Sequence, residues 1–415
     1  MKLLITGGGT GGHVFPGIAV AEAVAAAAPD CEILFVGGRQ GLESKAVPDA
    51  GFAFEGVPAT GLLGKKVLAI PIVLWTTWRG LIGSLRIIAR FDPDVVFATG
   101  GYVSGPVSLA GVLRGRPLVL HEQNSVPGIT NRILARLARE VHLNMPGARR
   151  YFSKRRHLKL SGNPIRKTIL EGDRHRARQE FGLRRDRATV LILGGSQGAR
   201  SINRAAVGAI GRLLRDRRDL QFVVQTGRRD AAFVRGRLGR YRDRVCVRPF
   251  IDQMGDAYDL ADLVIARAGA MTLAEITACG KPSILVPFPH ATHNHQEANA
   301  RAMMQMGAAE MILDHELKPE KLAATVLKFI DTPPILREMS VSVRMLSRPA
   351  AAEKIAAALL AFGGVADGEN GGASRPVTSS EQPSRTAERR SSRGRRGGRR
   401  PRPDSRWPTR QRGAR

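Results

Sequence analysis

The chain has 415 residues, 43% of them hydrophobic, and a formal net charge of +29. A chain of this length exceeds what a single hydrophobic core usually contains, and its apolar residues suffice for two cores. We therefore expect two domains. The three cysteines have neither paired nor metal-ligand spacing, which excludes a disulfide framework or a zinc site and indicates a reducing, cytoplasmic compartment. We expect no signal peptide and no membrane-spanning segment. The first residues run straight into glycines, and no uncharged apolar stretch of about 18 residues follows.

The positive charge is divided between the body of the chain and its end. Residues 364–415 contain fourteen arginines and five acidic residues, a net +9, which leaves +20 for the body. A basic body attracts polyanions such as nucleic acid, anionic lipid or phosphorylated substrates, and charge does not choose among them. Residues 363–415 are rich in Gly, Ser, Pro and Arg, so we expect a disordered tail. We interpret this tail as a solvated extension, with membrane or nucleic-acid binding as the alternatives.

Short β-rich runs alternate with helical patterns along the first half. Strands are expected at 2–6, 32–37, 95–99, 117–121 and 141–144, with an alanine-rich helix at 16–28. The second half begins the pattern again, with strands at 189–193, 221–225, 245–248, 263–266 and 283–287. Each half opens with a strand, a glycine-rich turn and a helix. This order predicts two similar doubly wound α/β domains in tandem, with a hinge near residues 161–164.

A glycine-rich loop at residues 7–12 joins the first strand to the first helix. Backbone amides and a helix N-terminus at such a loop suit an anion. The glycines fit a dinucleotide fingerprint, but the second strand ends at Arg39 without the carboxylate that the fingerprint requires, so an NADP site through Arg39 is the alternative. His13 lies where the loop becomes helix. It is the candidate general base, because imidazole titrates near neutral pH, and a structural role is the alternative.

Two further turns of the second half have the same strand–turn–helix form. Residues 194–199 match the first loop and also fit the nucleophile elbow of hydrolases. The acid and histidine that an elbow needs have only the candidates Asp256 or Asp262, and His290. Residues 267–275 follow a strand end, where ligands of open α/β sheets gather. There Glu275 can accept hydrogen bonds from ribose hydroxyls. The alternative is that it only compensates the helix dipole, which is worth about 0.3–1 kcal/mol.

Two other segments were weighed for metal and membrane binding. Asp92 and Asp94 resemble a D-x-D metal motif, but they precede a strand and therefore lie away from the ligand edge, so no metal is expected. Residues 67–90, preceded by Lys65 and Lys66, combine apolar residues with basic ones. This composition predicts either a membrane-interface patch or a core helix with a basic face. The patch would consist of Leu74, Trp75, Trp78 and Arg79.

The loops in their order along the chain resemble one family, the bacterial peptidoglycan N-acetylglucosaminyltransferases. The similar segments, within residues 1–362, are 8–16, 100–106, 121–124, 162–166, 194–200, 250–254, 267–275 and 295–296. The resemblance implies an α/β GT-B fold with a substrate cleft between two Rossmann-like domains. Residues 1–163 would take the acceptor and associate with the membrane, residues 164–339 would bind the donor, and a helix at about 340–362 would pack back onto the first domain.

The activity implied by this resemblance is an inverting transfer of N-acetylglucosamine from UDP-N-acetylglucosamine. The acceptor would be the C4 hydroxyl of undecaprenyl-pyrophosphoryl-N-acetylmuramoyl-pentapeptide, and the product the lipid-linked disaccharide precursor of peptidoglycan. The implied location is the cytoplasmic face of the bacterial inner membrane, with the enzyme peripheral on an anionic surface through the 67–90 patch. Other cell-wall synthesis proteins are possible partners, and no cofactor is expected.

The resemblance also implies roles for single residues. His13 would be the base, Ile251 would meet uracil through its backbone, and Glu275 would bind the ribose. Further donor contacts would come from Thr10, Gly11, Gly12, Asn124, Arg166, Ser196, Ala270, Met271, Thr272, Leu273, Ala274 and Gln296.

Three other functions are carried as alternatives. A UDP-N-acetylglucosamine epimerase would share the tandem fold and donor site but would need neither a lipid acceptor nor the tryptophan patch. An NADP-dependent oxidoreductase depends on the first glycine loop and Arg39. A nucleic-acid-binding protein depends on the charge and the tail alone, because the body has no nucleic-acid-binding module. The arginine-rich tail departs from the family pattern and leaves the implied chemistry unchanged.

Overall fold

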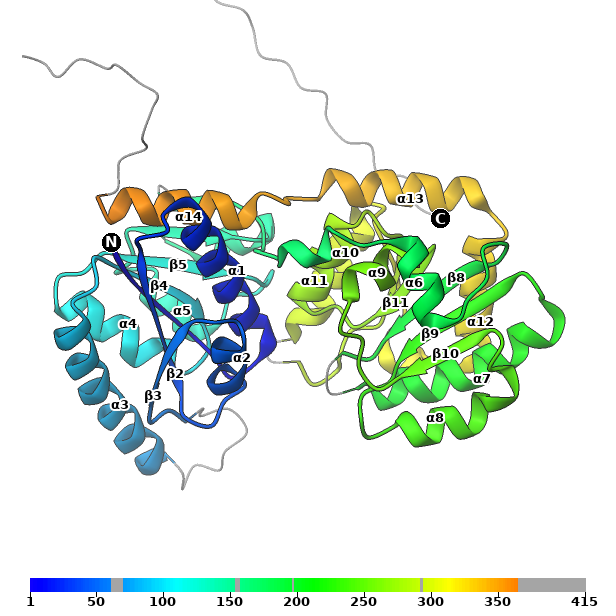
Figure 1. The fold of residues 1–415 in the computed structure, drawn as a ribbon, viewed down its shortest axis with the longest axis horizontal. Helices are drawn as coiled ribbons and strands as arrows, with labels where there is room; N and C mark the ends of the chain where they lie inside the picture. The colour runs from blue at the N-terminus through cyan, green and yellow to red at the C-terminus, as the bar shows by residue number, and fades with distance from the viewer. Residues whose placement is uncertain (61–69, 154–156, 196–197, 292–293, 365–415) are drawn as a thin grey trace, which may run out of the picture. The chain divides into compact units, whose positions relative to one another are not determined.

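The computed structural model describes residues 1–60, 70–153, 157–195, 198–291 and 294–364. These residues form two parallel β-sheets, one in each half of the chain, with helices against them (Figure 1). The expected tail at 363–415 lies outside the described residues from 365 onward. The two-sheet α/β architecture predicted from the sequence is confirmed.

The first sheet has seven strands in the order β3-β2-β1-β4-β5-β6-β7. Its strands are β1 (Lys2–Gly7), β2 (Glu32–Gly38), β3 (Ala53–Val57), β4 (Val95–Gly100), β5 (Leu118–Glu122), β6 (Glu140–Leu143) and β7 (Leu158–Leu160). Its helices are α1 (Gly11–Ala27), α2 (Glu43–Asp49), α3 (Ile70–Phe91), α4 (Ser104–Leu113) and α5 (Ile129–Leu134), with a 3₁₀ helix η2 (Pro146–Tyr151).

Successive residues of the central strands enter two separate cores, because side chains alternate between the faces of a sheet. Leu4 and Val96 pack in one core, which includes residues of α3 and α4. Leu3 and Ile5 pack in the other core, which is formed with α1 and α14 (Ala351–Phe362). Both faces are therefore buried, as parallel sheets require.

The second sheet has six strands in the order β10-β9-β8-β11-β12-β13. Its strands are β8 (Ala188–Leu193), β9 (Leu220–Gln225), β10 (Val245–Arg248), β11 (Leu263–Ala266), β12 (Ser283–Leu285) and β13 (Glu310–Met311). Its helices are α6 (Arg174–Phe181), α7 (Arg200–Asp216), α8 (Ala231–Leu238), α9 (Met254–Leu260), α10 (Ala270–Ala278), α11 (His295–Gln305), α12 (Pro319–Ile330) and α13 (Pro333–Met345).

The segment expected as one helix at about 340–362 comprises the end of α13 and the whole of α14. Met339 and Val343 of α13 belong to the core of the second half. In α14, Ile355 and Leu359 are fully buried in the first-half core, where the helix contacts α1. The chain therefore leaves the second half after α13 and ends its described part on the first.

The sequence analysis did not predict the sheet-edge strands β3, β7 and β13. They have five, three and two residues. Each pairs on one side only, so the pattern of a doubly buried strand is weak or missing. None of them carries a predicted site residue.

Candidate functional site

The first glycine loop follows β1 and is closed by a carboxylate from α2. The Gly9 amide donates a hydrogen bond to Glu43 Oε2 at 3.1 Å, and the Gly38 amide donates to Glu43 Oε1 at 2.9 Å. Glu43 is buried, 1% exposed. The carboxylate of Glu43 therefore lies beside the loop at the end of β2. The dinucleotide fingerprint requires an acid at this place, and the strand itself does not supply one. No sequence pattern pointed to Glu43, because it lies five residues beyond that strand in a separate helix.

His13 lies in the first turn of α1 and is held by the end of β4. Its Nδ1 lies 3.0 Å from the Thr99 carbonyl oxygen, while Thr99 Oγ1 donates to the His13 carbonyl oxygen at 2.7 Å. A carbonyl only accepts, so Nδ1 carries the proton and the neutral ring keeps its lone pair on Nε2. Gly100, with φ of +106°, permits this approach, because a Cβ there would lie 3.1 Å from the His13 ring.

The surroundings of His13 favour its neutral form. Burial lowers the pKa of His13 below 6.5, and the hydrogen bonds of Thr99 and Gln123 oppose this shift. A neutral imidazole with its lone pair on Nε2 can accept a proton at neutral pH. The geometry thus fits the base role predicted from the sequence and equally permits a positioning role.

Asn124, at the end of β5, is tied to the second half. Its amide donates to the buried carboxylate of Glu122 at 2.9 Å, and its Oδ1 accepts from Asn299 Nδ2 at 3.4 Å. Asn299 also accepts from the Ser125 amide at 2.9 Å and donates to the Ala268 carbonyl at 3.2 Å. This buried asparagine of α11 joins the Asn124 loop to the turn after β11, and the sequence analysis missed it. Neither its type nor its spacing distinguishes it from a solvent-exposed helix residue.

The turn after β11 carries the largest group of predicted donor contacts. Gly269 is the N-cap residue of α10, and no side chain caps that helix. Met271 and Thr272 are partly exposed, whereas Leu273 and Ala274 are buried. Asn163, from the segment predicted as a hinge, donates to the Ala270 carbonyl at 3.3 Å.

Glu275 in α10 is positioned by a tyrosine that the sequence analysis missed. Tyr258 is fully buried, and its hydroxyl donates to Glu275 Oε2 at 3.0 Å. Burial raises the pKa of Glu275, and the Tyr258 hydrogen bond and the positive charge of Arg166 lower it. Arg166 also lies 5.1 Å from the centre of the Phe15 ring in α1. Arg166 and Glu275 are thus brought together near the start of α1.

The remaining predicted donor contacts lie at four separate places. Helix α1, which contacts α10, has Thr10 as its N-cap and begins with Gly11 and Gly12. Ile251 is buried, and its amide donates to Gln225 Oε1 at 3.0 Å, so a backbone contact with uracil would use its carbonyl. Gln296 Oε1 accepts from the Phe288 amide at 3.0 Å, which uses one of its polar atoms locally. Ser196 lies outside the described residues.

The predicted patch on α3 is exposed. Leu74, Trp75 and Trp78 are 65, 58 and 52% exposed, and the two indole rings stack with centroids 5.1 Å apart. Arg79 is exposed beside them, and Lys65 and Lys66 lie outside the described residues. By length and composition alone α3 could cross a membrane, with a mean hydropathy of 1.2 over its most apolar 18 residues, but the core helix of a soluble protein meets the same criterion. Ile87 and Ile88 of this helix are nevertheless buried in the first-half core.

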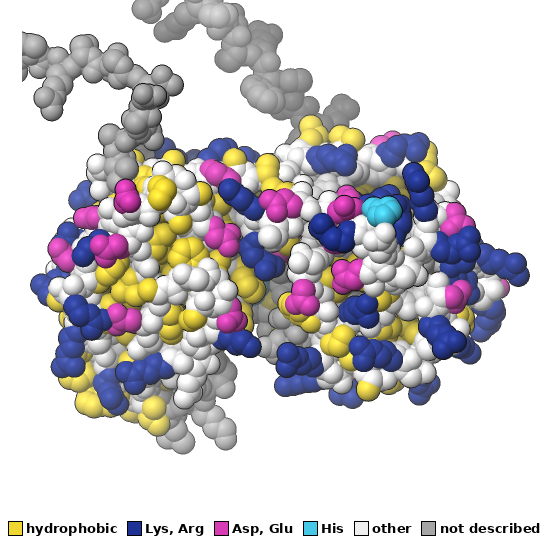
Figure 2. Space-filling model, viewed as in Figure 1, with side chains coloured by type: hydrophobic (Ala, Val, Ile, Leu, Met, Phe, Trp, Pro, Cys, Tyr) yellow, Lys and Arg dark blue, Asp and Glu magenta, His cyan; other side chains and the backbone are white. Residues whose placement is uncertain are grey.

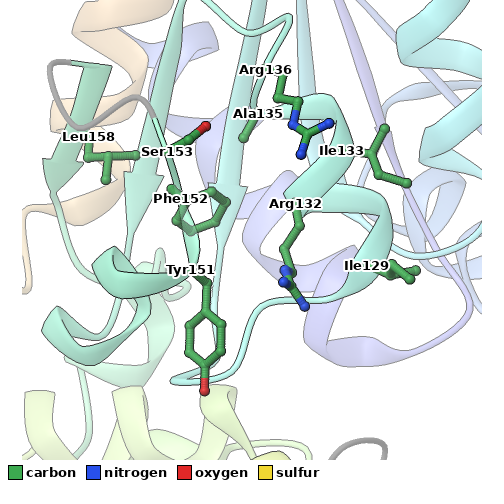
Figure 3. A pocket seen from close by; sticks show the side chains of 9 residues that line it. All are labelled: Ile129, Arg132, Ile133, Ala135, Arg136, Tyr151, Phe152, Ser153 and Leu158. Carbon is green, nitrogen blue, oxygen red and sulfur yellow. The ribbon is translucent and has the colours of Figure 1, made fainter.

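A cavity of about 290 Å³ in the first half is lined by other residues (Figure 3). It lies between α5 and the segment that follows η2, and it is bordered by Arg132 of α5 and by Arg136, two residues after the end of that helix. Arg132 stacks on the Tyr151 ring at 5.6 Å. None of the predicted site residues lines this cavity, so it is separate from the predicted donor contacts.

Comparison with known proteins first defines the class. Residues 3–143 match the glycosyltransferase family 28 N-terminal domain, and residues 189–355 match the glycosyltransferase family 28 C-terminal domain. These matches cover most of the chain and define a glycosyltransferase with the GT-B fold predicted above.

Individual relatives narrow the class. The chain is 44% identical over 355 residues to a protein from Thermodesulfovibrio yellowstonii, covering 86% of this chain and 97% of the relative. It is 45% identical over 358 residues to one from Myxococcus xanthus, covering 86 and 91%. Both relatives are named UDP-N-acetylglucosamine–N-acetylmuramyl-(pentapeptide) pyrophosphoryl-undecaprenol N-acetylglucosamine transferase. The chain belongs to this family of transferases, the MurG family.

Solved structures agree with this assignment. The crystal structure of MurG from Acinetobacter baumannii is similar with a TM-score of 0.69 and 26% identity, covering 87% of this chain and 99% of that one. A UDP-GlcNAc 2-epimerase from Neisseria meningitidis has a TM-score of 0.64 at 12% identity, covering 87 and 100%. The likeness to the epimerase concerns the fold alone.

Proposed function

We propose that this chain transfers N-acetylglucosamine from UDP-N-acetylglucosamine to the C4 hydroxyl of undecaprenyl-pyrophosphoryl-N-acetylmuramoyl-pentapeptide. The observation that carries the proposal is the identity of 44 and 45% to transferases of that name over nearly their whole length. The product is the lipid-linked disaccharide. The anomeric carbon is inverted, because a single displacement by the hydroxyl attacks the face opposite the departing diphosphate.

The acceptor hydroxyl is activated by His13. Its Nδ1 proton is held by the Thr99 carbonyl, so Nε2 takes the proton of the hydroxyl as the new C–O bond forms. The lowered pKa of His13 keeps the ring neutral before the reaction. Thr99, which binds both the ring and the backbone of His13, fixes the direction of the lone pair.

The donor is held by the second half of the chain. Glu275 accepts hydrogen bonds from the ribose hydroxyls through Oε1, since Tyr258 occupies Oε2. As the bond to the diphosphate breaks, negative charge grows on UDP. The uncapped N-terminus of α10 and the guanidinium of Arg166 stabilise that charge.

The α3 patch places the enzyme on the cytoplasmic surface of the membrane that contains the acceptor. Stacked indoles flanked by arginine suit the interface between lipid headgroups and acyl chains.

Replacing Trp75 and Trp78 together by Ser should weaken binding to phosphatidylglycerol vesicles about tenfold or more, because both exposed rings lose their burial in lipid. Cosedimentation measures this, and the matched control replaces the exposed Met306 and Met345 of the second half by Ser. Equal losses of vesicle binding in both double variants would show that α3 does not contact the membrane.

The test of the proposed activity is transfer of labelled N-acetylglucosamine from UDP-N-acetylglucosamine to a lipid-linked muramoyl-pentapeptide analogue. We expect a lipid-linked labelled disaccharide and release of one UDP for each sugar transferred. Conversion of UDP-N-acetylglucosamine to another UDP-sugar without lipid product would instead establish the epimerase. Consumption of neither substrate would refute both functions.

A further inference from the structure

A second cavity, of about 620 Å³, lies where the strands of the second sheet begin. Its lining comes from the segments before β8 and β12, the end of α9, and the helices α6 and α13. The turns assigned to the donor follow the carboxyl ends of the same strands. This cavity, called the basic cavity below, is therefore at the opposite edge of the sheet and distinct from the donor site.

The basic cavity has an excess of positive charge. Two acidic residues line it, Asp186 and Asp262. The cationic residues that line it are Arg174, Arg178, Arg185, Arg187, Lys281, Arg337 and Arg344. Lys and Arg side chains are also gathered on the surface around α6 and α13 (Figure 2). Bringing so many like charges together is unfavourable unless an anion compensates them.

The two acids do not supply that compensation, because each is already paired. Asp186 accepts from Arg184 Nε at 3.0 Å and from its second terminal nitrogen at 3.1 Å. Asp262 accepts from the Thr189 amide at 2.8 Å and from Arg174 at 3.3 Å. Asp186 is thus neutralised by an arginine outside the cavity lining, and Asp262 is occupied by a single arginine of the lining.

Four of the lining arginines have no acidic partner. Arg185, Arg337 and Arg344 form no ion pair with any residue that the structure describes, and neither does Arg178. The Nε of Arg178 is buried without a hydrogen-bond acceptor among those residues. A buried N–H without an acceptor is costly, and the four unpaired guanidinium groups can all donate to a bound anion.

Arg344 is held over the cavity by a glycine. Gly280, with φ of +64°, packs so closely that a Cβ there would lie 2.6 Å from Arg344 Nε. Ser340, one turn earlier in α13, donates to the Gly280 carbonyl at 2.7 Å. The α10–β12 turn and α13 therefore meet at this point, and guanidinium groups from α13 and α6 line one concave site.

We propose that the basic cavity binds a phosphate-bearing anion of at least two negative charges. Guanidinium groups form paired, planar hydrogen bonds with phosphate oxygens, and several of them around a concave site select a compact, highly charged group. The volume lies in the range of small-molecule sites. A free diphosphate and the headgroup of an anionic phospholipid share this chemistry.

The test uses the full chain with saturating UDP, which occupies the donor site, and inorganic pyrophosphate as the probe. Isothermal titration compares the native protein with Arg337→Gln/Arg344→Gln. The control Arg235→Gln/Arg237→Gln removes two charges from α8 in the same half. We expect saturable pyrophosphate binding that weakens about tenfold or more in the α13 variant and less than about twofold in the control, because only the first loses charge-assisted hydrogen bonds.

Vesicles that contain cardiolipin, whose headgroup carries two phosphodiesters and hence two negative charges, identify the source of the anion. A selective loss of vesicle binding in the α13 variant assigns the site to a lipid headgroup. Equal vesicle binding by both variants, with selective loss of pyrophosphate binding, assigns it to a free anion. Equal weakening of pyrophosphate binding in both variants, or no saturable binding by the native protein, overturns the proposal. An acidic peptide that binds the cavity where pyrophosphate does not would also overturn it.

Discussion

The glycine loop after β1 and the turn after β11 share one pattern of strand, glycine and helix, but their electrostatic surroundings are opposite. The carboxylate of Glu43 accepts the Gly9 amide in the first. The second has an uncapped helix N-terminus at Gly269, and the positive charge of Arg166 acts on Glu275. A diphosphate would be repelled by Glu43 and attracted by Arg166. Two similar local patterns thus differ in electrostatic environment, because residues distant in sequence supply the charge.

The largest expected effect tests the first half as the catalytic one. His13→Ala should lower kcat about 100-fold or more, because no other group takes the proton of the acceptor hydroxyl. Affinity for UDP should change less than about twofold, since the donor is held by the second half. Steady-state transfer kinetics and UDP titration measure the two quantities, with exposed His315→Ala as control. Similar kcat values for His13→Ala and native protein would remove His13 from the chemistry.

The next effect concerns acid stability of the first half. Burial lowers the pKa of His121 from 6.5 to about 3, with Nε2 donating to the Gly162 carbonyl at 3.0 Å. The unfolded chain therefore binds a proton that the folded chain excludes between these values, and stability falls as pH drops below about 6.5. We expect a loss of roughly 2–3 kcal/mol by pH 4.5 from this group.

Urea unfolding between pH 8 and 4.5 measures that loss, and hydrogen exchange shows which sheet opens. We expect β5 to lose protection before β9. His121→Asn should lower stability at pH 8 but flatten its dependence on pH. A variant with the native pH dependence would show that other groups cause the acid sensitivity.

A smaller effect tests the role of Glu43 as the loop's own anion. Glu43→Gln should destabilise the protein by about 1–3 kcal/mol, because an amide cannot accept from both the Gly9 and Gly38 amides. UDP affinity should stay within about twofold. Urea unfolding and UDP titration test this beside Glu353→Gln, which changes an exposed carboxylate of α14. A marked loss of UDP affinity without loss of stability would mean that the first loop contacts the nucleotide after all.

The smallest expected effect tests how the second half binds the donor. Tyr258→Phe should raise KM for UDP-N-acetylglucosamine about fivefold with little change in kcat, since it removes one hydrogen bond that orients Glu275. Tyr241→Phe is the control, because its hydroxyl also donates within this half, to the Gly211 carbonyl at 3.4 Å. A drop in kcat at unchanged KM would place Tyr258 in the chemical step.

The elements that the sequence predicted are those with strong local patterns. The buried strands β1, β4, β8 and β11 were found within one residue at either end, because both of their faces are apolar. The two-residue strand β13 has too few side chains to form a pattern. For α3, the sequence left open a membrane patch or a core helix, and the structure shows buried and exposed faces on one helix.

By itself, the sequence determined the tandem α/β order, the glycine turns and the position of His13 at a helix start. These follow from periodicity and from the backbone freedom of glycine, which act over a few residues. Only the tertiary structure decided that Glu43 closes the first loop, that Tyr258 orients Glu275 and that Asn299 joins Asn124 to Ala268. The partners in these contacts lie between 17 and 175 residues apart, except that Glu43 also binds Gly38 five residues away. Hydrogen bonds between such partners depend on how strands and helices pack, and no local pattern records them.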